Sequence, residues 1–198
     1  MKRFFVCLLV LCFVLFLNAC ASSKSVDEST IENNKPQANP ADELRNTLKA
    51  HTFHGVTFYL PEGFTQSNIF ADSNKGRITF TDSLGINVLV NVTEASYVSQ
   101  YYGQEVFDSQ SYAQVYYDTY SDEISDDNAL EVKLANQYDV PYIRLCGNVD
   151  GAEQFGVMGY YYSGSYCACI SVYTDDQELW SQHESDMLNF ATIATFSR

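Results

Sequence analysis

Length, composition and charge are those of a folded, acidic, single-domain protein. The 198 residues are 46% hydrophobic and 15% aromatic, which is far more apolar than a disordered chain. The formal net charge is −14, and loss of Lys2 and Arg3 with an N-terminal leader would make it −16. This balance argues against nucleic acid or anionic lipid headgroups as partners, because both attract clustered Lys and Arg.

The N-terminus has the features of a secretion signal. Lys2 and Arg3 precede an uninterrupted apolar run at residues 4–17. As a helix this run would span about 21 Å, which is short of the roughly 30 Å hydrocarbon core of a bilayer. The run therefore predicts a cleavable signal peptide over residues 1–19 rather than a permanent membrane span.

The residues that follow the apolar run are Leu17, Asn18, Ala19 and Cys20. They resemble the lipobox of bacterial lipoproteins, with an aliphatic residue, a small residue and the cysteine in the required order. Asn18 is a less usual occupant of its tolerant position. The resemblance implies signal-peptidase cleavage before Cys20 and acylation of that thiol, including palmitate. The expected product is a protein anchored by lipid to the extracytoplasmic face of the cell membrane.

A polar stretch separates this anchor from the patterned part of the chain. Residues 21–41 are rich in Ser, Asn, Asp and Glu and hold Pro36 and Pro40. Such a stretch cannot bury enough apolar surface to become ordered. We therefore expect a lipidated tether over residues 20–41 and a single globular domain over residues 42–198.

Hydrophobic periodicity predicts the elements of this domain in order. Residues 42–50 are consistent with a short helix capped by Asp42. Alternating apolar residues predict strands at 56–60, 77–82 and 86–93. Tyr112, Val115, Tyr116 and Tyr120 form one helical stripe, which an acidic loop at 121–128 follows. Four further strands are expected at 131–137, 141–149, 154–162 and 166–173, with turns at 150–151 and 163–164.

The last predicted element is a helix that opens with Asp175 as its N-cap and Glu178 three residues later. Its apolar side should cover a sheet. Period-two strands with one buried face favour antiparallel pairing. The expected fold is therefore α+β, a mostly antiparallel sheet sandwiched with helices.

Two stretches are similar to a known fold. One is Gly55–Phe64, a strand that ends in a Pro-Glu-Gly-aromatic turn. The other is the C-terminal part of the chain, in which the predicted hairpins are followed by Ile170–Tyr173, a helix with Trp180 and Glu184, and a final Thr195-Phe196. Together they resemble the PsbP-like fold, which the PsbP extrinsic protein of photosystem II and a Ran-binding nuclear import factor share. The resemblance covers about residues 52–196. It implies a module that binds or assembles other proteins rather than an enzyme, and it carries over no functional residue.

The cysteines of the domain allow several interpretations. Cys167 and Cys169 should project to the same face of one strand, about 6.6 Å apart. Cys146 lies on an earlier strand. The three thiols are either small apolar core residues, or Cys146 forms a disulfide with Cys167 or Cys169, or they serve a metal or redox role.

Other candidate groups also have two interpretations. His51 and His54 would share a metal only on a helix, and their setting is strand-like; His183 should lie along the last helix. The acidic loop 121–128 is either a solvated loop or a weak calcium site. The many tyrosines suit half-exposed packing as well as platforms for sugars or peptides, and Tyr160 and Tyr162 should face away from Tyr161.

No hydrolase, zinc-protease or phosphate-loop motif is found in the sequence. We therefore expect a non-catalytic protein-binding or assembly lipoprotein that needs no cofactor and whose partner protein is unknown. The alternatives are a small-molecule or cation-binding lipoprotein and an enzyme without a recognised motif.

Overall fold

The computed structural model describes residues 39–72, 76–123, 130–149 and 152–196, within the compact unit Ala38–Arg198. In this part of the chain the helices are α2 (Pro40–Arg45), α3 (Ala95–Tyr102), α4 (Ser109–Glu123) and α5 (Gln177–Thr192). The strands are β1 (Lys49–Phe53), β2 (Val56–Leu60), β3 (Thr65–Asp72), β4 (Arg77–Thr81), β5 (Asn87–Glu94), β6 (Glu131–Gln137), β7 (Val140–Val149), β8 (Ala152–Tyr162), β9 (Tyr166–Thr174) and β10 (Thr195–Phe196). None of the described helices is long and apolar enough to cross a membrane.

The strands form two antiparallel sheets. The larger has seven strands in the order β3-β4-β5-β9-β8-β7-β6, and the smaller has the order β1-β2-β10. Strand β5 pairs with β9 from Asn87 opposite Tyr173 to Glu94 opposite Tyr166, and this pairing joins the early strands to the later meander. The predicted α+β class with antiparallel pairing is confirmed.

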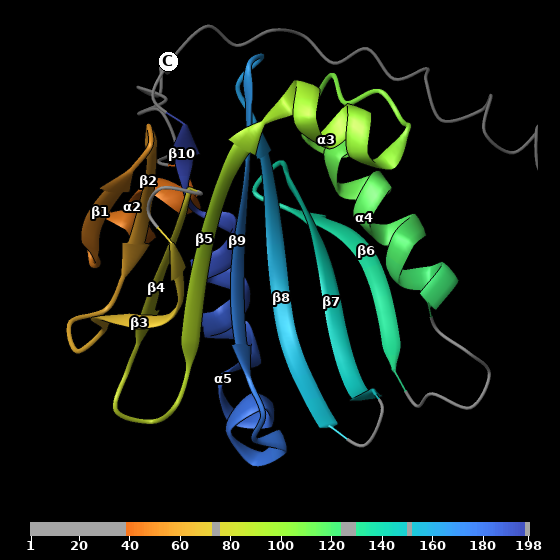
Figure 1. Cartoon of the computed structure of the whole chain (residues 1–198). Helices are drawn as coiled ribbons and strands as arrows, with labels where there is room; N and C mark the ends of the chain where they lie inside the picture. The colour runs from red at the N-terminus through yellow and green to blue at the C-terminus, as the bar shows by residue number, and fades with distance from the viewer. Residues whose placement is uncertain (1–38, 73–75, 124–129, 150–151, 197–198) are drawn as a thin grey trace, which may run out of the picture. The chain divides into compact units, whose positions relative to one another are not determined.

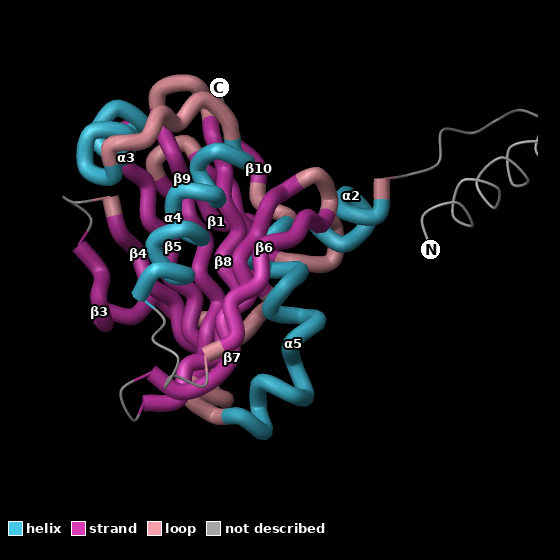
Figure 2. The backbone as a smooth tube through the Cα atoms, turned by 90° about the vertical axis from the view of Figure 1, so that its right-hand side faces the viewer, coloured by secondary structure: helices cyan, strands magenta, loops and turns pink. Residues whose placement is uncertain are grey.

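Helices cover both faces of the seven-stranded sheet. Helices α3 and α4 lie on one face, while α5 lies on the other and packs chiefly against β8 and β9 (Figures 1 and 2). We call these the α4 face and the α5 face. The predicted packing of the C-terminal helix on the sheet is confirmed.

Strand alternation decides which residues reach which face. On β5, Val88, Val90 and Val92 are buried toward the α5 face, so Asn87, Leu89, Asn91 and Thr93 project toward the α4 face. On β8, Tyr161 belongs to the α5-face core and Tyr160 to the α4-face core, as predicted.

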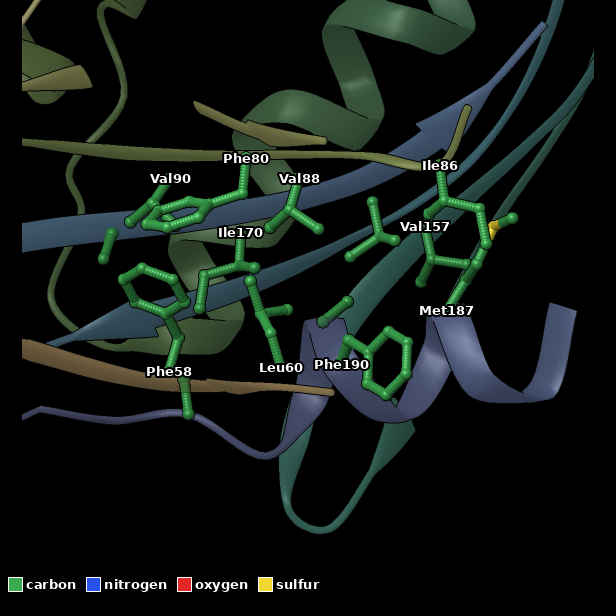
Figure 3. Packing of buried hydrophobic residues seen from close by; sticks show 14 of the residues in the cluster. Phe58, Leu60, Phe80, Ile86, Val88, Val90, Val157, Ile170, Met187 and Phe190 are labelled. Atoms are coloured by element: carbon green, nitrogen blue, oxygen red, sulfur yellow. The ribbon is translucent and has the colours of Figure 1, made fainter. Parts of the chain in front are cut away.

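The α5 face has an aliphatic and phenylalanine core. Side chains from β2, β4, β5, β8, β9 and α5 meet in it (Figure 3); they include Phe58, Leu60, Phe80, Val88, Val90, Val157, Ile170, Met187 and Phe190. The end of α5 approaches β8 so closely that a Cβ on Gly159 would lie 1.9 Å from the Ala191 carbonyl oxygen. The Tyr161 hydroxyl donates to that same oxygen at 2.7 Å and accepts from the Ala194 amide at 3.1 Å.

Two predicted helix starts are wrong. Helix α2 begins at Pro40 with Asn39 as its N-cap, rather than at Asp42, and it ends at Arg45 because Lys49–Phe53 pair with β2 as strand β1. Helix α5 is capped by Asp176, whose carboxylate accepts from the amides of Glu178 and Leu179. Asp175 does not cap it, because β9 continues to Thr174, opposite Phe155.

Candidate functional site

A tyrosine-lined cavity of about 480 Å³ opens on the α4 face between β4, β5, α3 and α4. We call it the tyrosine pocket. Its lining residues are Arg77, Asn91, Thr93, Tyr97, Val98, Tyr101, Tyr102 and Tyr116. Its size lies within the range of small-molecule sites.

Two neighbouring strands supply the polar wall of the pocket. Arg77 on β4 lies directly opposite Asn91 on β5, and Thr93 follows on the same face of β5. Arg77 and Asn91 therefore project from adjacent positions. The valines on the other face of β5 fix this orientation, because a one-residue slip of register would expose them.

Helix α3 supplies the aromatic wall. It starts directly after β5, and the Ala95 amide donates to the Ser165 carbonyl at 3.0 Å. The helix ends at Gly103, whose left-handed φ of 68° turns the chain back. The Ser99 hydroxyl then accepts from the Val106 amide at 3.1 Å, which ties the returning loop to the helix.

The pocket tyrosines form a chain of ring contacts from the surface into the core. Tyr97 and Tyr101 stack with their centroids 6.1 Å apart and an interplanar angle of 22°. Tyr101 contacts Tyr102 at 4.8 Å, and Tyr102 contacts Tyr116 at 5.2 Å. Burial, together with the neighbouring Cys169 and Tyr102, raises the pKa of Tyr116 above its ordinary value. The outer rings are open to solvent, with Tyr97 60% and Tyr101 69% exposed.

Among the described residues that line the pocket, Arg77 alone carries a formal charge. It forms no ion pair with any residue that the structure describes. By contrast, Arg45 pairs with Asp42 at 2.6 Å and Arg144 pairs with Glu184 at 2.6 Å. Asp72 is the residue opposite Arg77 in the pairing of β3 with β4, so a ligand would meet the Arg77 guanidinium beside that position.

A second cavity of about 430 Å³ lies on the same sheet farther from α3. Leu89 lines it, whereas Asn91 and Thr93 of the same strand face line the tyrosine pocket. Likewise Tyr120 lines the second cavity and Tyr116, one turn earlier on α4, lines the pocket. The two cavities thus follow one another along β5 and α4.

Exposed aromatic side chains gather at the end of the sheet where α3 lies. Of the five large hydrophobic residues that are exposed in the described part of the chain, Tyr97 and Tyr101 are on α3, Phe107 follows it and Tyr166 starts β9 beside it. We call these four residues the α3-end surface. The fifth, Leu84, lies in the β4–β5 turn, at the opposite end of β5.

The predicted lipidation residues Leu17, Asn18, Ala19 and Cys20 lie outside the described residues, as does most of the acidic loop 121–128. Lipidation and calcium binding therefore stay predictions. In the residues that the structure does describe, no three His, Cys, Asp or Glu side chains are grouped so that they could hold a metal ion.

The three domain thiols are free. Cys167 and Cys169 lie together in the α4-face core, as the alternation predicted, whereas Cys146 packs against the α5-face core. Strand β8 separates their strands, so Cys146 is neither on the same face nor on a neighbouring strand. The structure thus has apolar packing of the thiols rather than the possible disulfide from Cys146 to Cys167 or Cys169.

The histidines do not form a site. His51 is on β1, stacked on Phe58 with a centroid distance of 5.5 Å, and burial together with Lys49 lowers its pKa. His54 is in the following turn with a left-handed φ of 46°. His183 is half-buried along α5, as expected, with Nδ1 3.4 Å from Asp186 Oδ2.

Arg77, Asn91 and Thr93 were not predicted as site residues from the sequence. They are the polar members of two alternating strands, and alternation alone marks them as the outer face. The sequence did predict that its many tyrosines suit either packing or a platform for sugars or peptides, and Tyr101, Tyr102 and Tyr116 are three of these tyrosines. Only the placement of α3 beside β4 and β5 separates these two roles.

The topology and layers described above define a PsbP-like fold. No family model matches the chain, and no curated protein matches its sequence. Among solved structures, cyanobacterial PsbP (CyanoP) from Synechocystis sp. PCC 6803 is similar at a TM-score of 0.50 and 15% identity, over 76% of this chain and 92% of that one. The resemblance that the sequence suggested is confirmed for the fold.

Two structures of the protein Mog1 are similar at lower scores. A mutant of Mog1 gives a TM-score of 0.48 at 10% identity, over 73% of this chain and 86% of that chain. The Ran-binding protein Mog1p of Saccharomyces cerevisiae gives 0.44 at 8% identity, over 71% and 84%.

Proposed function

We propose that the protein is a lipid-anchored module on the extracytoplasmic face of a membrane, and that it binds a partner protein without catalysis through the α3-end surface. The observation that carries the binding role is the gathering of Tyr97, Tyr101, Phe107 and Tyr166 at one end of the sheet. Exposed aromatic residues are enriched at the centres of protein interfaces.

The anchor is proposed from the sequence. Leu17, Ala19 and Cys20 match the lipobox, and the apolar run before them is too short to span a bilayer. Two acyl chains would contribute a gross anchoring free energy on the order of 20 kcal/mol, at about 0.8 kcal/mol for each buried methylene.

Metabolic labelling with radioactive palmitate in a bacterial host tests the anchor. The parent chain should be labelled and should partition into detergent, whereas Cys20→Ala should take up no label and accumulate as a longer precursor. A Cys146→Ala variant is the matched control, because it removes a thiol of the domain and should keep the label. Labelling of Cys20→Ala would overturn the anchor.

Photo-crosslinking tests the binding surface. A photoreactive phenylalanine at position 107 or 166 should form an adduct with one envelope protein, and the same group at position 84 should not. Leu84 is the matched control because it is 59% exposed, close to the 63% of Phe107, but lies at the other end of β5. Equal yields of adduct from all three positions would contradict a partner surface at α3.

A further inference from the structure

The tyrosine pocket has an electrostatic character unlike that of the whole protein. The chain carries a net charge of −14, which repels small anions on average. Yet the lining residues that the structure describes include Arg77 and no carboxylate. Asp72 lies opposite Arg77 in the pairing of β3 with β4, and no ion pair joins Arg77 to a described side chain. Arg77 is therefore the cationic group that the described lining offers to an anion.

The remaining lining residues suit a polyhydroxylated ring. The exposed, stacked rings of Tyr97 and Tyr101 offer flat apolar faces, against which the C–H face of a sugar packs. Asn91 and Thr93 add an amide and a hydroxyl that exchange hydrogen bonds with ligand hydroxyl groups. Val98 is the sole aliphatic residue of the lining, so an alkyl chain would find little matching surface.

From these observations we propose that the tyrosine pocket binds a saccharide with an anionic group, a carboxylate or a phosphate, that pairs with Arg77 while the sugar ring packs on Tyr97 and Tyr101. A guanidinium can hold either anion through two parallel hydrogen bonds. This site shares Tyr97 and Tyr101 with the α3-end surface. It goes beyond that surface through Arg77, Asn91 and Thr93, which line the pocket, whereas Phe107 and Tyr166 are not among the described lining residues.

Nitrogen-15 NMR titrations of the full chain in detergent test the proposal, with glucuronate, glucose 6-phosphate and glucose as probes. Glucuronate or glucose 6-phosphate should shift the backbone signals of β4, β5 and α3 and bind at least about tenfold more tightly than glucose, since hydrogen bonds to charged groups contribute roughly 1.5–3 kcal/mol. The charged sugar that binds more tightly shows whether the pocket prefers a carboxylate or a phosphate.

Matched variants assign the effect to residues. Arg77→Gln should remove the preference for the charged sugar, and Tyr101→Ala should weaken binding of charged and neutral sugars alike. Lys133→Gln, at an exposed position of β6, is the control that removes a cation elsewhere and should bind as the parent does. The dispersion of the NMR spectrum shows whether each variant is folded.

Three results would overturn the proposal: no shifts with either charged sugar, equal affinity for glucose, or an unchanged preference in Arg77→Gln. Binding of a glutamate-rich peptide that depends on Arg77, without binding of any sugar, would also overturn it. The outcome is separate from the partner surface, because loss of crosslinking at positions 107 and 166 leaves the sugar titration unaffected.

Discussion

The two faces of the seven-stranded sheet bury different kinds of side chain. The α5 face packs valines, phenylalanines and a methionine against a helix and the small sheet, with further partly buried hydrophobic residues against them. The α4 face also buries aliphatic side chains, such as Val115, Ile143 and Met158, but it adds two thiols and a group of tyrosines, and both cavities open on its side of β5. Aliphatic side chains gain only from burial, whereas a tyrosine also offers a hydroxyl and a ring face. The comparison therefore assigns stability mainly to the α5 face and binding to the α4 face.

The largest expected effect is a core truncation on the α5 face. Phe58→Ala should lower the free energy of unfolding by about 3–5 kcal/mol, because it leaves a cavity where a side chain only 1% exposed now packs on Phe80. Urea denaturation measures this. Tyr101→Ala on the α4 side is the control and should change the free energy by less than about 0.5 kcal/mol, since that ring is mostly exposed. Equal losses in the two variants would break the division between the faces.

A matched pair of hydroxyl deletions sharpens the same comparison. Tyr161→Phe should cost about 1–3 kcal/mol, because the Ala191 carbonyl and the Ala194 amide would lose a buried partner. Tyr112→Phe on the α4 face should cost less, because the buried Tyr112 hydroxyl meets no partner at good hydrogen-bond geometry in the described structure and has only a weaker contact with the Tyr116 side chain. Differential scanning calorimetry of both variants checks the difference. A larger loss in Tyr112→Phe would reveal a partner for that hydroxyl.

Local pattern was sufficient to predict most of the strands. Each alternating run such as Val88, Val90 and Val92 has one buried face, and this fixes both the strand and its orientation. The helix over residues 112–120 was predicted in the same way, because its apolar side chains repeat at helical spacing along one face. The sequence therefore also predicted which side chains of β8 and β9 share a face, including those of Tyr161 and Cys167.

Elements whose bounds are set by strand pairing were predicted less well. The predicted helix over residues 42–50 wrongly took in Lys49 and Ala50, and no strand was predicted over 51–53. Strand β1 forms by pairing with β2 through a hairpin turn at His54 and Gly55, both at positive φ. The N-cap of α5 was placed one residue early because Asp175 and Asp176 are chemically alike, and only the length of β9 selects the second.

The candidate site was the least predictable part. Arg77, Asn91 and Tyr101 come from three elements, and no spacing in the sequence reports that they meet. The sequence does not show that α3 lies beside β4 and β5. The position of α3 depends on the pairing of β5 with β9, which lies some 80 residues later and places Asn87 opposite Tyr173.

The smallest expected effect concerns the two thiols of the α4 face. Burial raises the pKa of Cys167 from 9.0 to about 12 and that of Cys169 to about 11. The folded state thus keeps protons that the unfolded state releases, so their stabilisation is complete below pH 9 and is lost as the pH rises through the folded values. At pH 9 each thiol should cost about 0.4 kcal/mol relative to pH 7, measured by urea denaturation in the presence of a reductant. The double variant Cys167→Ala, Cys169→Ala should lose this part of the pH dependence, whatever its stability at pH 7. If the parent and the double variant instead fell by the same amount between pH 7 and pH 9, the thiols would have to ionise in the folded state as readily as in the unfolded chain, and the α4-face core would have to admit water.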